Sequence, residues 1–116
     1  EKDSYMKVAF HLSQIRADEV RKALRNIKHL REDKPEAEIH AVSNTSAVTM
    51  MKQEGSFEEK IEELINQHDV KMKACSNSIE GTEMTRDELI EDVAVVGSGV
   101  AELAELQDNG FGYIKP

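Results

Sequence analysis

The sequence predicts an α/β protein in which a parallel sheet carries helices on both faces. Five strand-like runs alternate along the chain with helical segments, which is the order that parallel sheets with helical crossovers produce. One of these runs, residues 93–96, is continuously apolar, which is typical of a strand buried on both faces. Because the chain has 116 residues, we expect a single domain over residues 1–116.

The first half of the chain supplies two predicted strands and two predicted helices. Residues 6–12 form a short apolar run with β-forming side chains, which predicts the first strand. Residues 17–31 carry apolar side chains three and four positions apart, which predicts a helix that ends before Pro35. Residues 38–42 are the second predicted strand, and a short helix is expected over residues 45–51.

The middle of the chain carries two capping boxes and the only cysteine. The sequence Ser-Phe-Glu-Glu at residues 56–59 has the spacing of a capping box and predicts the start of a helix there. Residues 70–74 form the third predicted strand, which runs directly into Cys75. The sequence Thr-Arg-Asp-Glu at residues 85–88 is a second capping box, which predicts a short helical turn.

The last part of the chain supplies two strands around a helix. Residues 93–96 are the fourth strand, and Gly97-Ser98-Gly99 turns into a helix over residues 100–106. Tyr113 and Ile114 make the fifth strand. The glycine turn is similar to a dinucleotide-binding fingerprint, but Glu102 stands where the third glycine belongs, so we predict a tight turn whose backbone N–H groups could hold an anion.

Composition and charge exclude several classes of protein. The formal net charge is −8, so the chain lacks the surplus of lysine and arginine that nucleic acids and anionic membranes require. No apolar run approaches the ~18–20 residues that span a bilayer, and no signal peptide is visible. The single cysteine excludes an internal disulfide and a multi-cysteine zinc site. We therefore expect a cytoplasmic protein without a metal, a cofactor, direct nucleic-acid binding or membrane attachment.

Polar and reactive side chains follow the predicted strands at the points where the strands end. Because parallel strands end at the same edge of a sheet, these side chains are expected to meet there, where ligands bind. The residues placed at that edge are His11, Ser13, Ser43, Asn44, Thr45, Cys75, Ser76, Asn77, Gly97, Ser98 and Gly99. This edge is the predicted functional site.

Cys75 and His11 are the predicted catalytic residues. Cys75 precedes a helical turn, and a thiol at a helix N-terminus has a lowered pKa and forms the nucleophilic thiolate. The alternative interpretation of Cys75 is an inert, buried apolar side chain. His11 could activate the thiol, or it could be a histidine that is hydrogen-bonded at a strand end. The residues expected to line the site and to stabilise an anion are Ser76, Asn77, Asn44, Gly97, Ser98 and Gly99.

Three stretches of the chain together match a pattern known from one family. They are Val8-Ala9-Phe10-His11 with Asn26-Ile27, Ala74-Cys75-Ser76-Asn77-Ser78, and Val95-Val96-Gly97-Ser98-Gly99-Val100-Ala101-Glu102-Leu103 with Gln107, Gly110 and Tyr113-Ile114-Lys115-Pro116. On these residues the chain resembles the DsrE/DsrF-like family over nearly its whole length. The Cys75 segment and the C-terminal stretch are fairly specific in combination.

The resemblance implies a three-layer α/β/α sandwich around a five-stranded, mainly parallel sheet, assembled as a homo-oligomer, often a trimer or hexamer. It also implies that the cysteine matched by Cys75 accepts sulfane sulfur as a persulfide and passes it from a donor protein to an acceptor protein. A persulfide carrier needs one reachable thiol of low pKa and no second cysteine to resolve it as a disulfide. The alternative function is a non-catalytic, homo-oligomeric module that binds a small ligand in the same crevice, with Cys75 in its wall.

Overall fold

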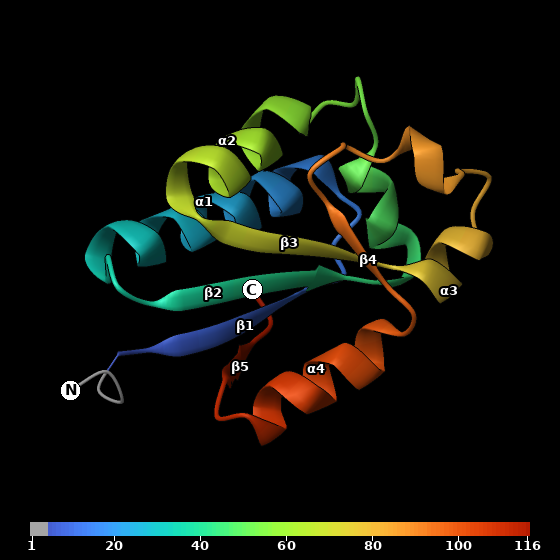
Figure 1. The fold of residues 1–116 in the computed structure, drawn as a ribbon. Helices are drawn as coiled ribbons and strands as arrows, with labels where there is room; N and C mark the ends of the chain where they lie inside the picture. The colour runs from blue at the N-terminus through green and yellow to red at the C-terminus, as the bar shows by residue number, and fades with distance from the viewer. Residues whose placement is uncertain (1–4) are drawn as a thin grey trace.

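A computed structural model describes residues 5–116 and shows an α/β fold built on one five-stranded sheet (Figure 1). The strands lie in the order β4-β3-β2-β1-β5, and each neighbouring pair is parallel. The elements are β1 (Lys7–Leu12), α1 (Ala17–Asp33), β2 (Glu38–Ser43), η2 (Thr45–Met51), α2 (Glu58–His68), β3 (Val70–Cys75), α3 (Ser76–Glu80), η3 (Arg86–Glu88), β4 (Ala94–Val96), α4 (Gly99–Asp108) and β5 (Gly112–Ile114). The predicted fold class and the alternation of strands with helices are confirmed.

Helices cover the two faces of the sheet unequally. α1 and α2 lie on one face, and α4 lies on the other (Figure 1). The larger core lies under α1, α2 and η2, where Ile27, Ile61 and Met72 are almost completely buried. The smaller core lies under α4 and consists of Ala9, Val42, Leu103, Leu106 and Phe111. Three layers are therefore present, but one of them is held by far less apolar surface.

α1 shows how the sequence pattern produces the larger core. Its buried side chains recur three and four positions apart, at Val20, Ala23, Leu24 and Ile27, so one face of the helix packs on the sheet. At the end of the helix, the Arg31 guanidinium donates to the backbone carbonyls of the residues after α1 and of His68 and Asp69 at the end of α2. Over residues 5–116 no helix combines the length and the apolar character needed to cross a bilayer.

The two predicted capping boxes have different outcomes. The box at residues 85–88 is confirmed, because the Thr85 and Glu88 side chains cap each other's backbone N–H groups at the start of η3. The box at residues 56–59 is wrong, since α2 begins at Glu58 and its N-cap residue, Phe57, makes no side-chain capping bond. The Glu58 carboxylate instead accepts a hydrogen bond of 2.7 Å from the Glu54 N–H and stabilises the preceding turn.

The prediction that the strand at residues 93–96 is buried on both faces is also wrong. β4 lies at one edge of the sheet and pairs only with β3. Ala94 is exposed, and Val95 and Val96 are half-buried. The apolar run therefore belongs to an edge strand. The short helix predicted over residues 45–51 is confirmed, and it has the tighter 3-10 geometry.

Candidate functional site

The carboxyl edge of the sheet brings His11, Asn44 and Cys75 together in a row on the α4 side. Alternate residues of a strand face the same side of the sheet. Val42 packs in the small core under α4, so Asn44, two positions further, lies on that side as well. His11 at the end of β1 contacts the Asn44 side chain, and Cys75 ends the neighbouring strand β3. The strand-end rule therefore predicts the location of the row correctly.

Cys75 lies at the junction of β3 and α3, where several hydrogen-bond donors surround its sulfur. The residue is 5% exposed and is the N-cap residue of α3. Burial by itself raises the pKa of the Cys75 thiol, but donors from the Ser78 hydroxyl and from the backbone N–H groups of Gly99, Ser78 and Asn77 more than offset it. The thiol pKa is thus lowered from its ordinary value, which favours the thiolate.

Ser78 is a site residue that the sequence analysis quoted in a motif but gave no role. Its Oγ accepts a hydrogen bond of 2.8 Å from the Thr45 N–H, at the start of η2. Because that bond uses an oxygen lone pair, the Ser78 hydroxyl hydrogen remains available for the Cys75 sulfur. Thr45 has a φ of 55°, a left-handed conformation that β-branched residues rarely adopt. The unusual backbone at Thr45 therefore helps to orient a donor toward the thiol.

Gly99, the first residue of α4, packs directly against the row. A Cβ atom at this position would lie 3.2 Å from the Cβ atoms of both Asn44 and Cys75. Only glycine allows the helix to approach this closely, and the approach brings the Gly99 N–H to the sulfur. Ser98 caps the helix, since its Oγ accepts a 3.1 Å hydrogen bond from the Ala101 N–H. Gly97 has open space around its Cα and makes no comparable contact.

The His11 ring belongs to the row but does not hydrogen-bond to the thiol. Its Nε2 lies 2.9 Å from Asn44 Oδ1, and its Nδ1 lies 2.6 Å from the Tyr113 hydroxyl. An amide oxygen can only accept, so Nε2 carries the hydrogen and the Tyr113 hydroxyl donates to Nδ1 when the ring is neutral. His11 therefore reaches the Cys75 region through Asn44, and both of its ring nitrogens are engaged.

Two predicted lining residues of α3 act in different ways. Ser76 is buried, and its hydroxyl accepts a hydrogen bond from the Arg86 guanidinium, which ties the start of α3 to η3. Asn77 is exposed and contributes its backbone N–H to the environment of Cys75.

Within residues 5–116, no group of three or more histidine, cysteine or acidic side chains is arranged to hold a metal ion.

Comparisons with known proteins agree with this architecture. The chain is similar over 96% of its length to protein MTH1491 of Methanobacterium thermoautotrophicum, a protein of unknown function, with 30% identity, a TM-score of 0.90 and 99% of that chain covered. It shares the fold of the ychN protein from E. coli, with 19% identity and a TM-score of 0.77 over 96% of this chain and 97% of that one. It also shares the fold of protein BT1422 from Bacteroides thetaiotaomicron, with 15% identity and a TM-score of 0.76 over 95% and 94% of the two chains.

The comparison with curated proteins found no match. A family model, by contrast, matches residues 6–116, which include every strand of the sheet and the whole row of His11, Asn44 and Cys75. The matched region is nearly the full chain, and the resemblance noted in the sequence is confirmed. The chain belongs to the DsrE/DsrF-like family.

Proposed function

We propose that this chain is a sulfur carrier in which Cys75 accepts sulfane sulfur as a persulfide and passes it to an acceptor. The observation that carries the proposal is the set of donors around the Cys75 sulfur, which lowers the thiol pKa although the residue is almost buried. The family to which the chain belongs is generally related to sulfur relay, which supports the same chemistry.

The loading step is a thiol exchange that needs no external oxidant. The Cys75 thiolate attacks the outer sulfur of a donor persulfide, a new sulfur–sulfur bond forms at Cys75, and the bond within the donor breaks. The donor leaves as a thiolate, and the transferred sulfur keeps its own hydrogen. One sulfur–sulfur bond is made and one is lost, so the step is balanced.

In the unloading step the Cys75 sulfur is the leaving group, whereas in the loading step it is the nucleophile. An acceptor thiolate attacks the outer sulfur of the Cys75 persulfide, and the inner sulfur leaves as the Cys75 thiolate. A thiolate of low pKa is the better leaving group. The donors from Ser78 and Gly99 therefore raise the fraction of Cys75 that is thiolate and ready for loading, and they stabilise the thiolate that leaves in unloading.

The rest of the row has a supporting part in this proposal. His11 holds Asn44 through the 2.9 Å hydrogen bond and so fixes the wall next to the thiol. The carrier works with a donor protein and an acceptor protein in the cytoplasm, and it assembles as a homo-oligomer, a trimer or hexamer. Since Cys75 is 5% exposed, the partners must reach it through a narrow opening or a local movement.

The test is intact-mass spectrometry after incubation with cysteine and a cysteine desulfurase. We expect the wild-type chain to gain one sulfur that a reductant removes, and the Cys75→Ser variant to gain none. If the wild-type chain gains no sulfur and Cys75 is also alkylated slowly below neutral pH, the carrier proposal is wrong. A small-ligand-binding module with Cys75 in its wall would then be the better interpretation.

A further inference from the structure

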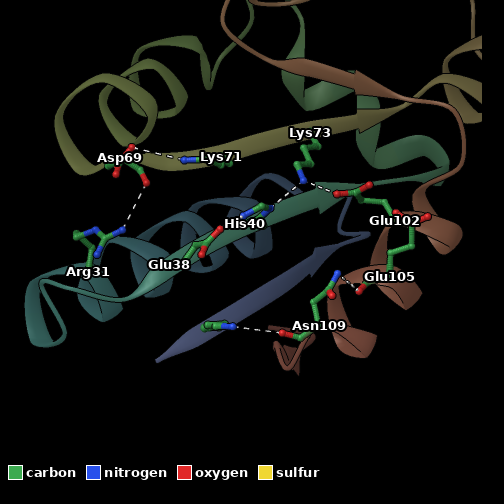
Figure 2. A network of polar contacts seen from close by, with 10 residues as sticks. Arg31, Glu38, His40, Asp69, Lys71, Lys73, Glu102, Glu105 and Asn109 are labelled. Atoms are coloured by element: carbon green, nitrogen blue, oxygen red, sulfur yellow. Dashed lines mark hydrogen bonds and ion pairs between the residues drawn. The ribbon is translucent and has the colours of Figure 1, made fainter. Parts of the chain in front are cut away.

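A largely buried ion pair links the strand that ends in Cys75 to the helix that contacts it. Lys73 precedes Cys75 by two residues on β3, and Glu102 follows Gly99 by three residues on α4. The Lys73 ammonium group contacts the Glu102 carboxylate, and the two side chains are only 14% and 19% exposed (Figure 2). The pair therefore connects the two elements whose junction holds the thiol.

His40 of β2 directs the Lys73 ammonium group toward this contact. The Lys73 Nζ lies 2.8 Å from His40 Nδ1, and His40 Nε2 lies 3.0 Å from a Glu38 carboxylate oxygen (Figure 2). An ammonium group can only donate, so Nδ1 is the acceptor and Nε2–H donates to Glu38. Burial above all lowers the pKa of His40, and the Lys73 charge adds to this, while Glu38 opposes it. A neutral His40 is thus the form that fits the network.

Apart from the close packing of Gly99 against Asn44 and Cys75, few side-chain contacts hold the first turn of α4 in place. The apolar residues that anchor the helix, Leu103 and Leu106, lie beyond its first four residues. Val100 in the first turn is 67% exposed, and Gly97 before the helix is in open space. Glu102 therefore supplies a side-chain link from this turn to the sheet, in addition to the backbone contact at Gly99.

We infer that Lys73 and Glu102 are positioning residues that keep the first turn of α4, and with it the Gly99 N–H, against the Cys75 sulfur. The use of this arrangement in sulfur transfer rests on the proposed function, but the arrangement itself can be tested without any sulfur donor. Glu102 does not act on the sulfur directly, because it contacts Lys73 and not the thiol.

The direction in which the pH profile of Cys75 alkylation moves separates a positioning role of Glu102 from a simple effect of its charge. A negative charge near a thiol opposes formation of the thiolate, so removing Glu102 only as a charge would make the thiolate easier to form. Removing Glu102 as a positioning residue has the opposite effect, because the Gly99 donor then moves away from the sulfur. The pH dependence of Cys75 alkylation reports which of these occurs.

The experiment compares iodoacetamide alkylation of Glu102→Ala with that of Glu105→Ala across a range of pH. Glu105 is an exposed carboxylate on the same helix, about one turn further along, so its removal is a matched loss of charge. We expect the alkylation rate of Glu102→Ala at mildly acidic pH, taken relative to its own rate at alkaline pH so that access to the thiol cancels, to be about three- to tenfold lower than the same ratio for wild type, with the profile displaced to higher pH. Glu105→Ala should follow the wild-type profile.

Two further variants keep the test decisive if Glu102→Ala folds poorly. Glu102→Gln keeps a carbonyl oxygen that accepts from Lys73 but loses the negative charge, so its alkylation profile should match wild type or move slightly to lower pH. Lys73→Met removes the other partner and should also displace the profile to higher pH, although loss of its positive charge acts in the same direction, so the sign for Glu102→Ala decides between the two readings. A profile of Glu102→Ala displaced to lower pH, or an unchanged profile for both Glu102→Ala and Lys73→Met, would overturn the inference.

The outcome is independent of the sulfur-loading assay. If the wild-type chain does not accept sulfur but the Glu102→Ala profile is displaced, the positioning role stands and the proposed function fails. If the chain accepts sulfur but no profile is displaced, the proposed function stands and the positioning role fails.

Discussion

Replacing Gly99 by alanine tests how tightly α4 packs on the thiol. The new Cβ would lie 3.2 Å from the Cβ atoms of Asn44 and Cys75, whereas carbon atoms in good contact are about 3.5–4.0 Å apart. Neither neighbouring Cβ can rotate away, so the helix must move by about 0.3–0.8 Å. Overpacking of this kind costs about 1–3 kcal/mol, and the gain in helix propensity returns at most about 1 kcal/mol.

We therefore expect Gly99→Ala to lower the free energy of unfolding by about 1 kcal/mol and to reduce Cys75 alkylation at acidic pH several-fold relative to the variant's own rate at alkaline pH. Urea denaturation and the alkylation profile measure the two effects. Gly97→Ala is the matched control, because a Cβ there meets nothing within 4 Å, and it should alter neither quantity. If the two variants behave alike, the close approach of α4 to the thiol does not exist in solution.

Three further predictions follow from the same region. Ser78→Ala should slow Cys75 alkylation at acidic pH several-fold, because it removes the side-chain donor, and an unchanged profile would exclude that bond. The pKa of His40 is lowered in the folded chain, so its contribution to the free energy of unfolding is present above the ordinary pKa of 6.5 and is lost as the pH falls through the lowered pKa. Urea midpoints measured across this pH range should show that loss for the wild-type chain and not for His40→Gln. Thr45→Gly should leave the free energy of unfolding unchanged or raise it by up to about 1 kcal/mol, because glycine adopts a φ of 55° freely. The control Ser46→Gly should lower it, and an equal loss in both variants would contradict backbone strain at Thr45.

Local patterns predicted the elements of this fold, but not the features that depend on strand order. The helical spacing in α1 and the run of β-forming residues in β1 each have a local physical cause, and both elements lie where expected. The burial of β4 depends on whether another strand lies beyond it, and nothing within residues 93–96 contains that information. The capping box expected at residues 56–59 failed because α2 begins at Glu58, one residue later than a box with Ser56 as N-cap requires, and the local spacing does not reveal that boundary.

In the candidate site, too, some features could be predicted from the sequence and others could not. The convergence of Cys75, Asn44 and Gly99 followed from a general rule about the ends of parallel strands. The role of Ser78 depends on the left-handed backbone at Thr45, 33 positions away, and no sequence pattern indicated it. Lys73 and Glu102 are 29 positions apart, and charged residues are so frequent in this chain that the pair could not be selected from the sequence.

The thin apolar layer under α4 also bears on how reagents reach the sulfur. Proteins open in separate cooperative units, and units with few buried contacts open at lower free energy than the molecule as a whole. The core under α4 consists of Leu103 and Leu106 of the helix packed on Ala9, Val42 and Phe111, whereas the opposite face is packed under three helical elements. We expect brief native-state detachment of α4 to admit a partner to Cys75 while β1, β2 and β3 remain folded. Amide hydrogen exchange would then be faster in α4 than in α1. The rate at which the buried Cys75 thiol reacts would be limited by how often α4 opens.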